Sequence, residues 1–249
     1  MQIEVEQVEY SAVETLRDLY RAEANCQIVR DSMMRRGLAD IYLARVEGSV
    51  AAYAGVLNKY DKDRLYEFYT IPSVRRHALP ILREIIAASG ATRMQAQTNM
   101  PLMLLMLFDC ATNIVSENIL FEDAFTSSLS IPGAIVRRVA DEDRPSIFEH
   151  KVEGVGDWMV EVDGVAVATG GAAYHYNPPY GDIYMEVDEK HRRKGYGSFL
   201  VQELKRICYE NGKKPAARCN VENVGSRGTL QKAGLLPCGR ILAGDLLPL

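Results

Sequence analysis

One short basic and glycine-containing segment, residues 192–197 (RRKGYG), constrains the fold of this chain more than any other segment. Upstream, residues 182–187 alternate in character and carry β-branched and aromatic side chains, which predicts a strand. Downstream, apolar residues recur at helical spacing from Leu200 to Cys208, and Asn211-Gly212 is a helix stop signal. The segment therefore lies at a turn between a strand and a helix.

This turn has the properties of an anion-binding loop. Glycines at positions 195 and 197 leave the first N–H groups of the helix open, and these donors attract phosphate oxygens together with the positive end of the helix dipole. Arg192, Arg193 and Lys194 add formal positive charge. A basic turn that caps a helix without any ligand is the alternative interpretation.

The spacing excludes two common nucleotide-binding motifs. The pattern G-x-x-x-x-G-K-[ST] is absent, and a dinucleotide-binding fingerprint would need a third glycine where Leu200 stands. Arranged as R-x-x-G-x-G after a strand, residues 192–197 instead resemble the pyrophosphate loop of the GNAT superfamily of N-acetyltransferases. The resemblance implies that the loop holds the pyrophosphate of coenzyme A.

A second motif follows on the elements where the same family carries it. Residues 217–221 predict a strand, and residues 222–235 predict a capped helix that ends at Gly234. Within it, residues 223–226 (NVGS) and 232–235 (KAGL) are similar to the family patterns N-x-x-[SA] and K-x-G-F. Taken alone, Asn223 is better explained as an ordinary N-cap. The resemblance implies coenzyme A contacts from Met185, Val187, Arg192, Arg193, Lys194, Gly195, Tyr196, Gly197, Ser198, Asn220, Asn223 and Ser226.

Composition and charge limit the other functions open to the chain. Its 249 residues suffice for one large domain or two ordinary ones. A formal net charge of -4 without a broad basic patch argues against nucleic acid binding. The apolar segment 101–108 (PLMLLMLF) is too short to span a membrane and predicts a core or interface helix.

The cysteines point to a reducing compartment. The five thiols are Cys26, Cys110, Cys208, Cys219 and Cys238, with no C-x-x-C pair and no histidine at metal-binding spacing. No signal-peptide pattern opens the sequence. We therefore expect a soluble, cytoplasmic protein with no bound metal, no membrane contact and no nucleic acid partner.

The two halves of the chain resemble each other. Residues 44–52 parallel residues 160–168, each as a hairpin with an acidic-glycine turn, and residues 68–76 parallel residues 185–193. Chance similarity between hairpins is the alternative. We predict an α/β fold of two GNAT-like domains, residues 1–131 and 132–249, each a twisted mixed sheet flanked by helices, with the boundary near residues 130–133.

The copies differ where chemistry would occur. Ala78 replaces Gly195 and Pro80 replaces Gly197 in the first half, and proline has no N–H to donate. The first half is therefore predicted to lack a working pyrophosphate loop.

The accessory elements also divide unequally. Two helices are expected at residues 11–24 and 28–37, whereas residues 140–157 leave too little room, so one or both helices are expected to be shortened there. Residues 113–129 predict two strands, whereas residues 238–246 leave room for one. The second half is therefore expected to borrow structure from the first.

The resemblance also implies catalytic roles. Met185 matches the strand residue whose backbone N–H polarises the thioester carbonyl, with Val187 contacting the pantetheine arm. The family's usual glutamate base falls on Gly181, so Asp182 and Glu186, with His175 on the preceding strand as a third, are candidate bases or structural residues. The tyrosine that usually acts as general acid is Leu230 here, and Tyr174, Tyr184 and Tyr196 do not simply replace it.

Three functions remain open from the sequence. The leading one is an N-acetyltransferase that moves an acetyl group from acetyl-CoA directly to a primary amine on a small molecule, peptide or protein. The others are a non-catalytic acyl-CoA-binding module and a partner-binding protein. A homodimer is also left open.

Overall fold

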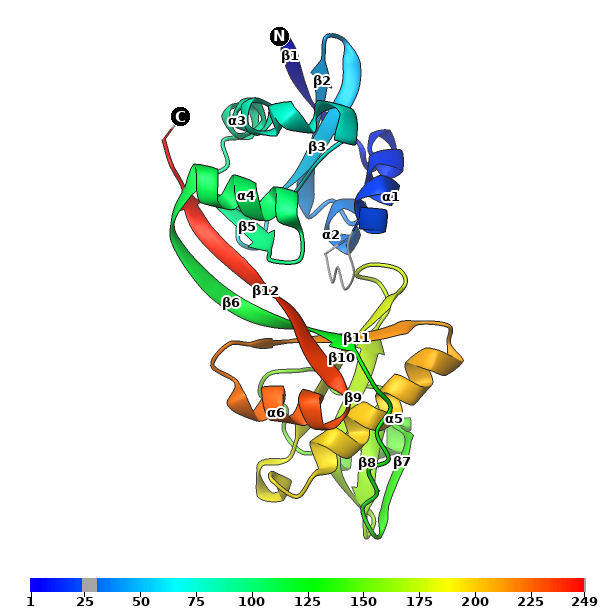
Figure 1. Ribbon diagram of the computed structural model, residues 1–249. Coiled ribbons are helices and arrows are strands. Elements are labelled where there is room, and N and C mark those ends of the chain that lie inside the picture. The colour runs from blue at the N-terminus through cyan, green and yellow to red at the C-terminus, as the bar shows by residue number, and fades with distance from the viewer. Residues whose placement is uncertain (24–30, 249) are drawn as a thin grey trace. The chain divides into compact units, whose positions relative to one another are not determined.

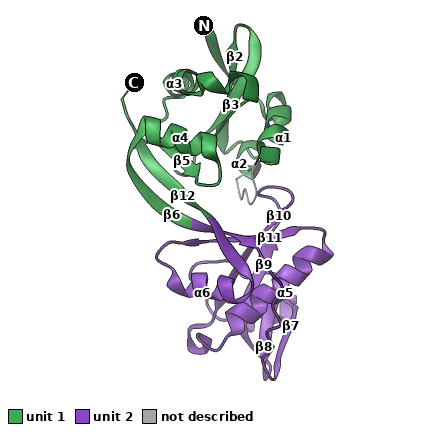
Figure 2. Cartoon of the chain, in the orientation of Figure 1, with its two compact units in different colours: residues 1–118, 239–249 green, residues 119–238 purple. Residues whose placement is uncertain are grey.

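The chain forms two compact units of mixed α/β structure (Figures 1 and 2). The computed structural model describes residues 1–23 and 31–248. Unit 1 contains residues 1–118 and 239–249, and unit 2 contains residues 119–238. The predicted α/β class, with helices flanking a mixed sheet, is confirmed.

The helices and strands follow in the order β1 (Ile3–Val8), α1 (Glu14–Glu23), α2 (Asp31–Arg35), β2 (Ala39–Val46), β3 (Ser49–Leu57), β4 (Arg64–Thr70), α3 (Ala78–Ser89), β5 (Arg93–Gln97), α4 (Pro101–Cys110), β6 (Ala111–Asp123), β7 (Ala134–Arg138), β8 (Trp158–Val162), β9 (Val165–Ala173), β10 (Tyr180–Val187), α5 (Tyr196–Glu210), β11 (Lys214–Asn220), α6 (Val224–Lys232) and β12 (Leu235–Leu246). Short 3-10 helices lie at Tyr10–Ala12, Pro72–His77, Asp141–Ser146 and Glu189–His191.

The internal repeat is present in the backbone. Strands β2 and β3 are joined at Glu47-Gly48 (φ 49° and 76°), and strands β8 and β9 are joined at Asp163-Gly164 (φ 50° and 75°). Each hairpin carries a register shift at the same distance from its turn. Two positive φ angles in succession are typical of the tight turns that suit a twisted hairpin.

In each unit one pair of parallel strands separates soon after it forms. Strands β4 and β5 pair at Arg64 and Leu65. Strands β10 and β11 pair from Tyr180 to Asp182. Beyond these points the facing backbone groups are not used in a ladder, so both units open at the same place in the repeat.

The units exchange strands. Strand β6 begins in unit 1 and ends in unit 2, while β12 begins in unit 2 and ends in unit 1. In unit 1, residues Ile241–Asp245 of β12 pair antiparallel with β5. In unit 2, β6 lies next to β11. The second half does borrow structure from the first, as its shortage of strands predicts.

The exchange changes the organisation expected from the sequence. The boundary predicted at residue 131 falls inside unit 2, although β7, the first strand of the second copy, does begin at Ala134. The two strands predicted at residues 113–129 are instead the single strand β6, and no glycine or proline interrupts residues 111–123.

The expected helices are partly present. Helices α1 and α2 fall within the two predicted helices of the first half, and residues 24–30, including Cys26, lie outside the described residues. Residues 140–157 form no α-helix, only the 3-10 helix Asp141–Ser146, which confirms the predicted shortening. Helix α4 is a core helix with an exposed edge, since Met103, Met106 and Leu107 are buried but Leu105 and Phe108 are exposed.

Each unit has its own hydrophobic core. In unit 2, α5 packs against β9 and β10 (Figure 1). Leu200, Val201 and Leu204 of this helix belong to the core. Cys110, Cys208 and Cys219 are free thiols, and all three are buried. Among the described residues, no helix is long and apolar enough to cross a membrane.

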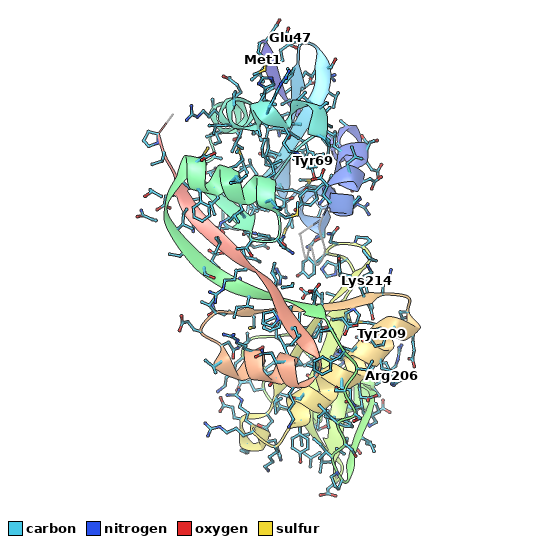
Figure 3. The ribbon with its side chains drawn as sticks, in the orientation of Figure 1. Met1, Glu47, Tyr69, Arg206, Tyr209 and Lys214 are labelled. Carbon is cyan, nitrogen blue, oxygen red and sulfur yellow. The ribbon has the colours of Figure 1, made fainter. Side chains whose placement is uncertain are left out.

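A buried lysine secures the end of β6 in unit 2. Lys205 Nζ lies 2.8 Å from an Asp123 carboxylate oxygen and donates to the carbonyl oxygens of Phe125 (2.6 Å) and Ala233 (3.0 Å). Tyr209, labelled in Figure 3, donates to the same carboxylate at 2.6 Å. Gly234 has φ 89°, and a Cβ there would lie 2.0 Å from the Phe125 carbonyl oxygen, so this approach requires glycine.

We expect Lys205→Met to lower the free energy of unfolding of unit 2 by about 3 kcal/mol, because it leaves two carbonyls and a carboxylate without their shared donor. The single tryptophan, Trp158, lies in unit 2, so its fluorescence during urea unfolding reports this unit. Arg206→Met, at the exposed neighbouring position, is the matched control and should change stability little. Equal effects of the two substitutions would contradict the role of Lys205.

Candidate functional site

The loop at residues 188–195 leads from β10 into the open N-terminus of α5. Asp188 accepts hydrogen bonds from the Lys190 backbone N–H (3.4 Å) and pairs with His191 (2.7 Å). Gly195 has φ 91°, a left-handed conformation that glycine adopts without strain. This conformation turns the chain sharply into the helix.

The first N–H groups of α5 remain available. The first helical hydrogen bond runs from the Phe199 N–H to the Gly195 carbonyl (3.0 Å), so the N–H groups of Tyr196, Gly197 and Ser198 precede it. No side chain among the described residues caps this end. These donors and the helix dipole favour an anion.

Charged side chains stand around this helix end as the sequence predicts. Arg192, Arg193 and Lys194 are exposed. Arg192 donates to the Val187 carbonyl (3.3 Å) and lies 3.8 Å from Glu189, a weak surface pair. The three cations are therefore free to reorient toward a phosphate.

Gly197 packs directly on β10. A Cβ at this position would lie 3.2 Å from side-chain atoms of Val187 and Thr229, and 3.4 Å from Met185. Met185, the predicted backbone donor to the thioester, and Val187, the predicted pantetheine contact, thus lie beside the start of α5. Met185 also lies beyond Asp182, the last residue of β10 that pairs with β11, and so belongs to the part of the strand that has separated from β11.

The second motif caps α6. The Asn223 side chain accepts a hydrogen bond from the Ser226 backbone N–H at 3.0 Å, the geometry of an N-cap. Asn220 organises the preceding turn by accepting from the Glu222 N–H (2.9 Å). In the structure Asn223 is thus the N-cap of α6, and its contact with coenzyme A stays a prediction.

Asp182 lies in an ion pair at the point where β10 leaves β11. Its carboxylate is 3.1 Å from Arg218 on β11, and only 7% of the residue is exposed. Burial raises the pKa of Asp182 to about 6, against the opposing effect of Arg218 and with a further increase from the Glu153 carboxylate. Arg218 also stacks over the Tyr176 ring at 5.0 Å.

Glu186, the second candidate base, holds a loop instead. Its carboxylate accepts hydrogen bonds from the backbone N–H groups of Lys151 (3.1 Å), Val152 (3.1 Å) and Glu153 (3.1 Å). Burial opposes its ionisation, but these hydrogen bonds keep the pKa below its usual value. A carboxylate bound in this way is a poor proton acceptor.

The remaining candidates are less well placed. His175 was expected on the strand before β10, but β9 ends at Ala173 and His175 is exposed in the following segment, against Tyr176. Leu230, at the expected acid position, is buried in the core of unit 2. Tyr174 lies 3.9 Å from the Cys208 sulfur, and burial raises the pKa of its hydroxyl to about 12.

Sequence reasoning missed Arg218 and the loop at residues 150–153. His150 bridges this loop to β9, since its Nε2 lies 3.0 Å from the Thr169 hydroxyl and its ring stacks on Phe148 at 4.7 Å. No motif marks these residues. Their roles come from distant pairings that only the folded sheet creates.

The corresponding turn in unit 1 has a different backbone. The 3-10 helix Pro72–His77 runs directly into α3, with Ala78 in right-handed helical conformation (φ -57°, ψ -43°) and its N–H bonded to the Arg75 carbonyl. Pro80 has no N–H at all. The described backbone therefore offers fewer open N–H donors here than at the start of α5, which agrees with the predicted loss of the pyrophosphate loop.

Comparison with known proteins identifies the domain. Residues 121–235 match the family model described as "Acetyltransferase (GNAT) family". This stretch of the chain is a GNAT acetyltransferase domain, and it contains the loop, the separated strands and α6. No curated protein sequence matches the chain.

Solved structures show the same fold over nearly the whole chain. An acetyltransferase of the GNAT family from Colwellia psychrerythraea aligns with a TM-score of 0.78 at 13% identity, covering 98% of this chain and 100% of that one. A GCN5-related N-acetyltransferase from Sphaerobacter thermophilus aligns at 0.61 and 15% identity, covering 99% and 96%.

A tandem GNAT protein from the clavulanic acid biosynthesis pathway, solved without AcCoA, aligns with a TM-score of 0.62 at 12% identity and covers all of both chains. At these identities the likeness establishes the fold. Together with the family match, it confirms the resemblance on which the sequence analysis rests.

We expect Gly197→Pro to abolish binding of acetyl-CoA, because it removes one N–H from the helix end and reproduces the proline of unit 1. Gly197→Ala is the matched control: it adds a Cβ in the same tight space but keeps the N–H, and should weaken binding less, by about tenfold at most. Isothermal titration measures both. Undiminished affinity in the proline variant would overturn this placement of the loop.

Proposed function

We propose that the chain is an N-acetyltransferase that uses acetyl-CoA and transfers the acetyl group directly to a primary amine. The observation that carries the proposal is the uncapped start of α5, with Gly195, Gly197 and three exposed cations beside the separated end of β10. This arrangement fits a pyrophosphate followed by a pantetheine arm, and the family match supports the same donor.

The residues present fit each part of this donor. The N–H groups of residues 196–198 and the side chains of Arg192, Arg193 and Lys194 would hold the pyrophosphate. Met185 and Val187 would contact the pantetheine arm. When bound, acetyl-CoA supplies a thioester acetyl group, and we assign the Met185 backbone N–H as the donor to its carbonyl oxygen, a type of interaction that contributes about 3 kcal/mol to transition-state stabilisation.

Asp182 is our choice for the general base. A lysine-like amine has a reference pKa of about 10.4 and must lose a proton before it attacks. A Cβ at Gly181 would lie 2.9 Å from Cys208 of α5, so the next side chain, Asp182, faces the opposite side of the sheet. With a pKa of about 6, its carboxylate is ionised at neutral pH yet basic enough to take a proton.

No tyrosine is assigned as the general acid that protonates the leaving thiolate. Leu230 is apolar and buried, so we propose that the thiolate of coenzyme A takes its proton from water, which its pKa of about 8.5 allows. The same feature is the specific observation in favour of the alternative, a non-catalytic acyl-CoA-binding module. We propose a small-molecule, peptide or protein amine as acceptor and a cytoplasmic location.

Asp182→Asn should lower kcat/KM by about 100-fold at pH 7, because the amide cannot accept a proton. In the unmodified protein the rate should fall below pH 6 as Asp182 becomes protonated, and this limb should disappear in the variant. At pH values near the pKa of the amine the two rates should converge. A thiol-release assay over a panel of amines measures the profiles.

Two further variants separate the roles in this assay. Asp141→Asn, at a fully exposed position, should leave the profile unchanged. Glu186→Gln should lower the rate while keeping the limb near pH 6, since Glu186 holds the 151–153 loop. Acetyl-CoA binding without product from any amine would favour the non-catalytic module over the enzyme.

A further inference from the structure

Unit 1 contains a cavity of about 420 Å³ at the place where β4 and β5 have separated. Its apolar wall comes from β4, α3 and the start of α4, including Phe68, Leu79, Met100, Leu102, Leu105 and Met106. This volume lies within the range of about 300–1,000 Å³ that is typical of small-molecule sites.

The cavity does not suit a ligand with a pyrophosphate. The turn beside it continues from the 3-10 helix Pro72–His77 into α3, and Pro80 removes an N–H from the helix start. A coenzyme A molecule would therefore find fewer backbone donors for its phosphates here than at the start of α5. The occupant must be recognised by other groups.

One end of the cavity is polar and ordered. Glu23 accepts hydrogen bonds from the Tyr69 hydroxyl (2.7 Å) and from Arg75 Nη2 (2.7 Å), and Arg75 also donates to the Thr70 carbonyl (2.9 Å). Arg75 lies over the Tyr69 ring at 5.5 Å (Tyr69 is labelled in Figure 3). These contacts hold the Arg75 guanidinium at the cavity wall.

Two buried polar atoms remain without partners in this region. Thr70 Oγ1 and Arg75 Nε have no hydrogen-bond partner among the described residues. Thr70 is fully buried at the end of β4. Both atoms are closed off from solvent and hence from the cavity, so the charge at the polar end is the better guide to the chemistry of the occupant.

The formal charge at the polar end is positive. Glu23 is neutralised by Arg75, whereas no described carboxylate forms an ion pair with Arg76, whose Nε instead donates to His77 Nε2 (2.9 Å). The unbalanced positive charge at this end of the cavity is therefore that of Arg76. A negatively charged head group would complement it, and the apolar wall would receive a hydrocarbon body.

We propose that this cavity binds a small amphiphilic carboxylate, with its head group at Arg76 and its apolar body among the Met and Leu side chains of α3 and α4. The site belongs to unit 1 and does not depend on acyl transfer in unit 2. Unit 1, which lacks a pyrophosphate loop, would thus bind a ligand different from that of unit 2.

Isothermal titration of the full chain with octanoate tests the proposal, with 1-octanol and octylamine as probes of equal length. Octanoate should bind and the other two should bind at least about tenfold more weakly, since they lack the negative charge. Equal binding of octanoate and 1-octanol, preferred binding of octylamine, or no binding of octanoate would each overturn the proposal.

Variants locate the site. Arg76→Gln should weaken octanoate binding ~5-fold, whereas Arg83→Gln, an exposed arginine on the same helix α3 that does not line the cavity, should leave it unchanged. Leu102→Trp, which fills the cavity, should abolish binding, with thermal unfolding as the check that the variant is folded. Octanoate binding that survives both Arg76→Gln and Leu102→Trp would overturn the assignment.

A final titration distinguishes octanoate binding in unit 1 from binding in unit 2. Octanoate binding should be unchanged in Gly197→Pro and in the presence of saturating coenzyme A. Competition by coenzyme A would place octanoate in unit 2 and contradict the proposed site, without bearing on whether unit 2 is an acetyltransferase.

Discussion

The early separation of β10 from β11 is the constraint on which the site in unit 2 depends. A parallel pair that continued past Asp182 would use its N–H and carbonyl groups in the ladder and leave no slot between the strands. The separation is stable because residues 182–187 of β10 stay paired with β9 on the other edge, and one face of the strand packs against α5. Beyond Asp182, the edge of β10 that faces β11 is thereby left without strand pairing and can bind a ligand.

The local features of this site could be predicted from the sequence. Gly195, Gly197 and the cap at Asn223 each act through the backbone within a few residues, so their spacing carries the information. The repeat was readable for the same reason, since its hairpin turns depend on an acidic-glycine pair. Helix α4 was recognisable by composition alone.

What the sequence did not reveal depends on contacts between distant residues. Asp182 and Arg218 pair between β10 and β11, two strands that the whole of α5 separates in the sequence. Glu186 accepts hydrogen bonds from the backbone of a much earlier loop, and that loop carries no motif. From the sequence, only a shortage of strands in the second half could be inferred, and not the exchange itself. No local sequence feature determines which part of the sheet β6 or β12 joins. His175 was misplaced because the end of β9 is set by pairing with β10, which a short apolar run does not define.

The exchanged strands also bear on how the protein is made. Strand β5 belongs to the first copy, yet one of its two neighbours in the sheet is the last strand of the chain, where Arg93 faces Asp245. Contacts so far apart in sequence are costly in loop entropy and slow to form. During synthesis unit 1 cannot complete its sheet until residues 241–245 have emerged, so the usual order in which an N-terminal domain finishes folding first is not available to this chain.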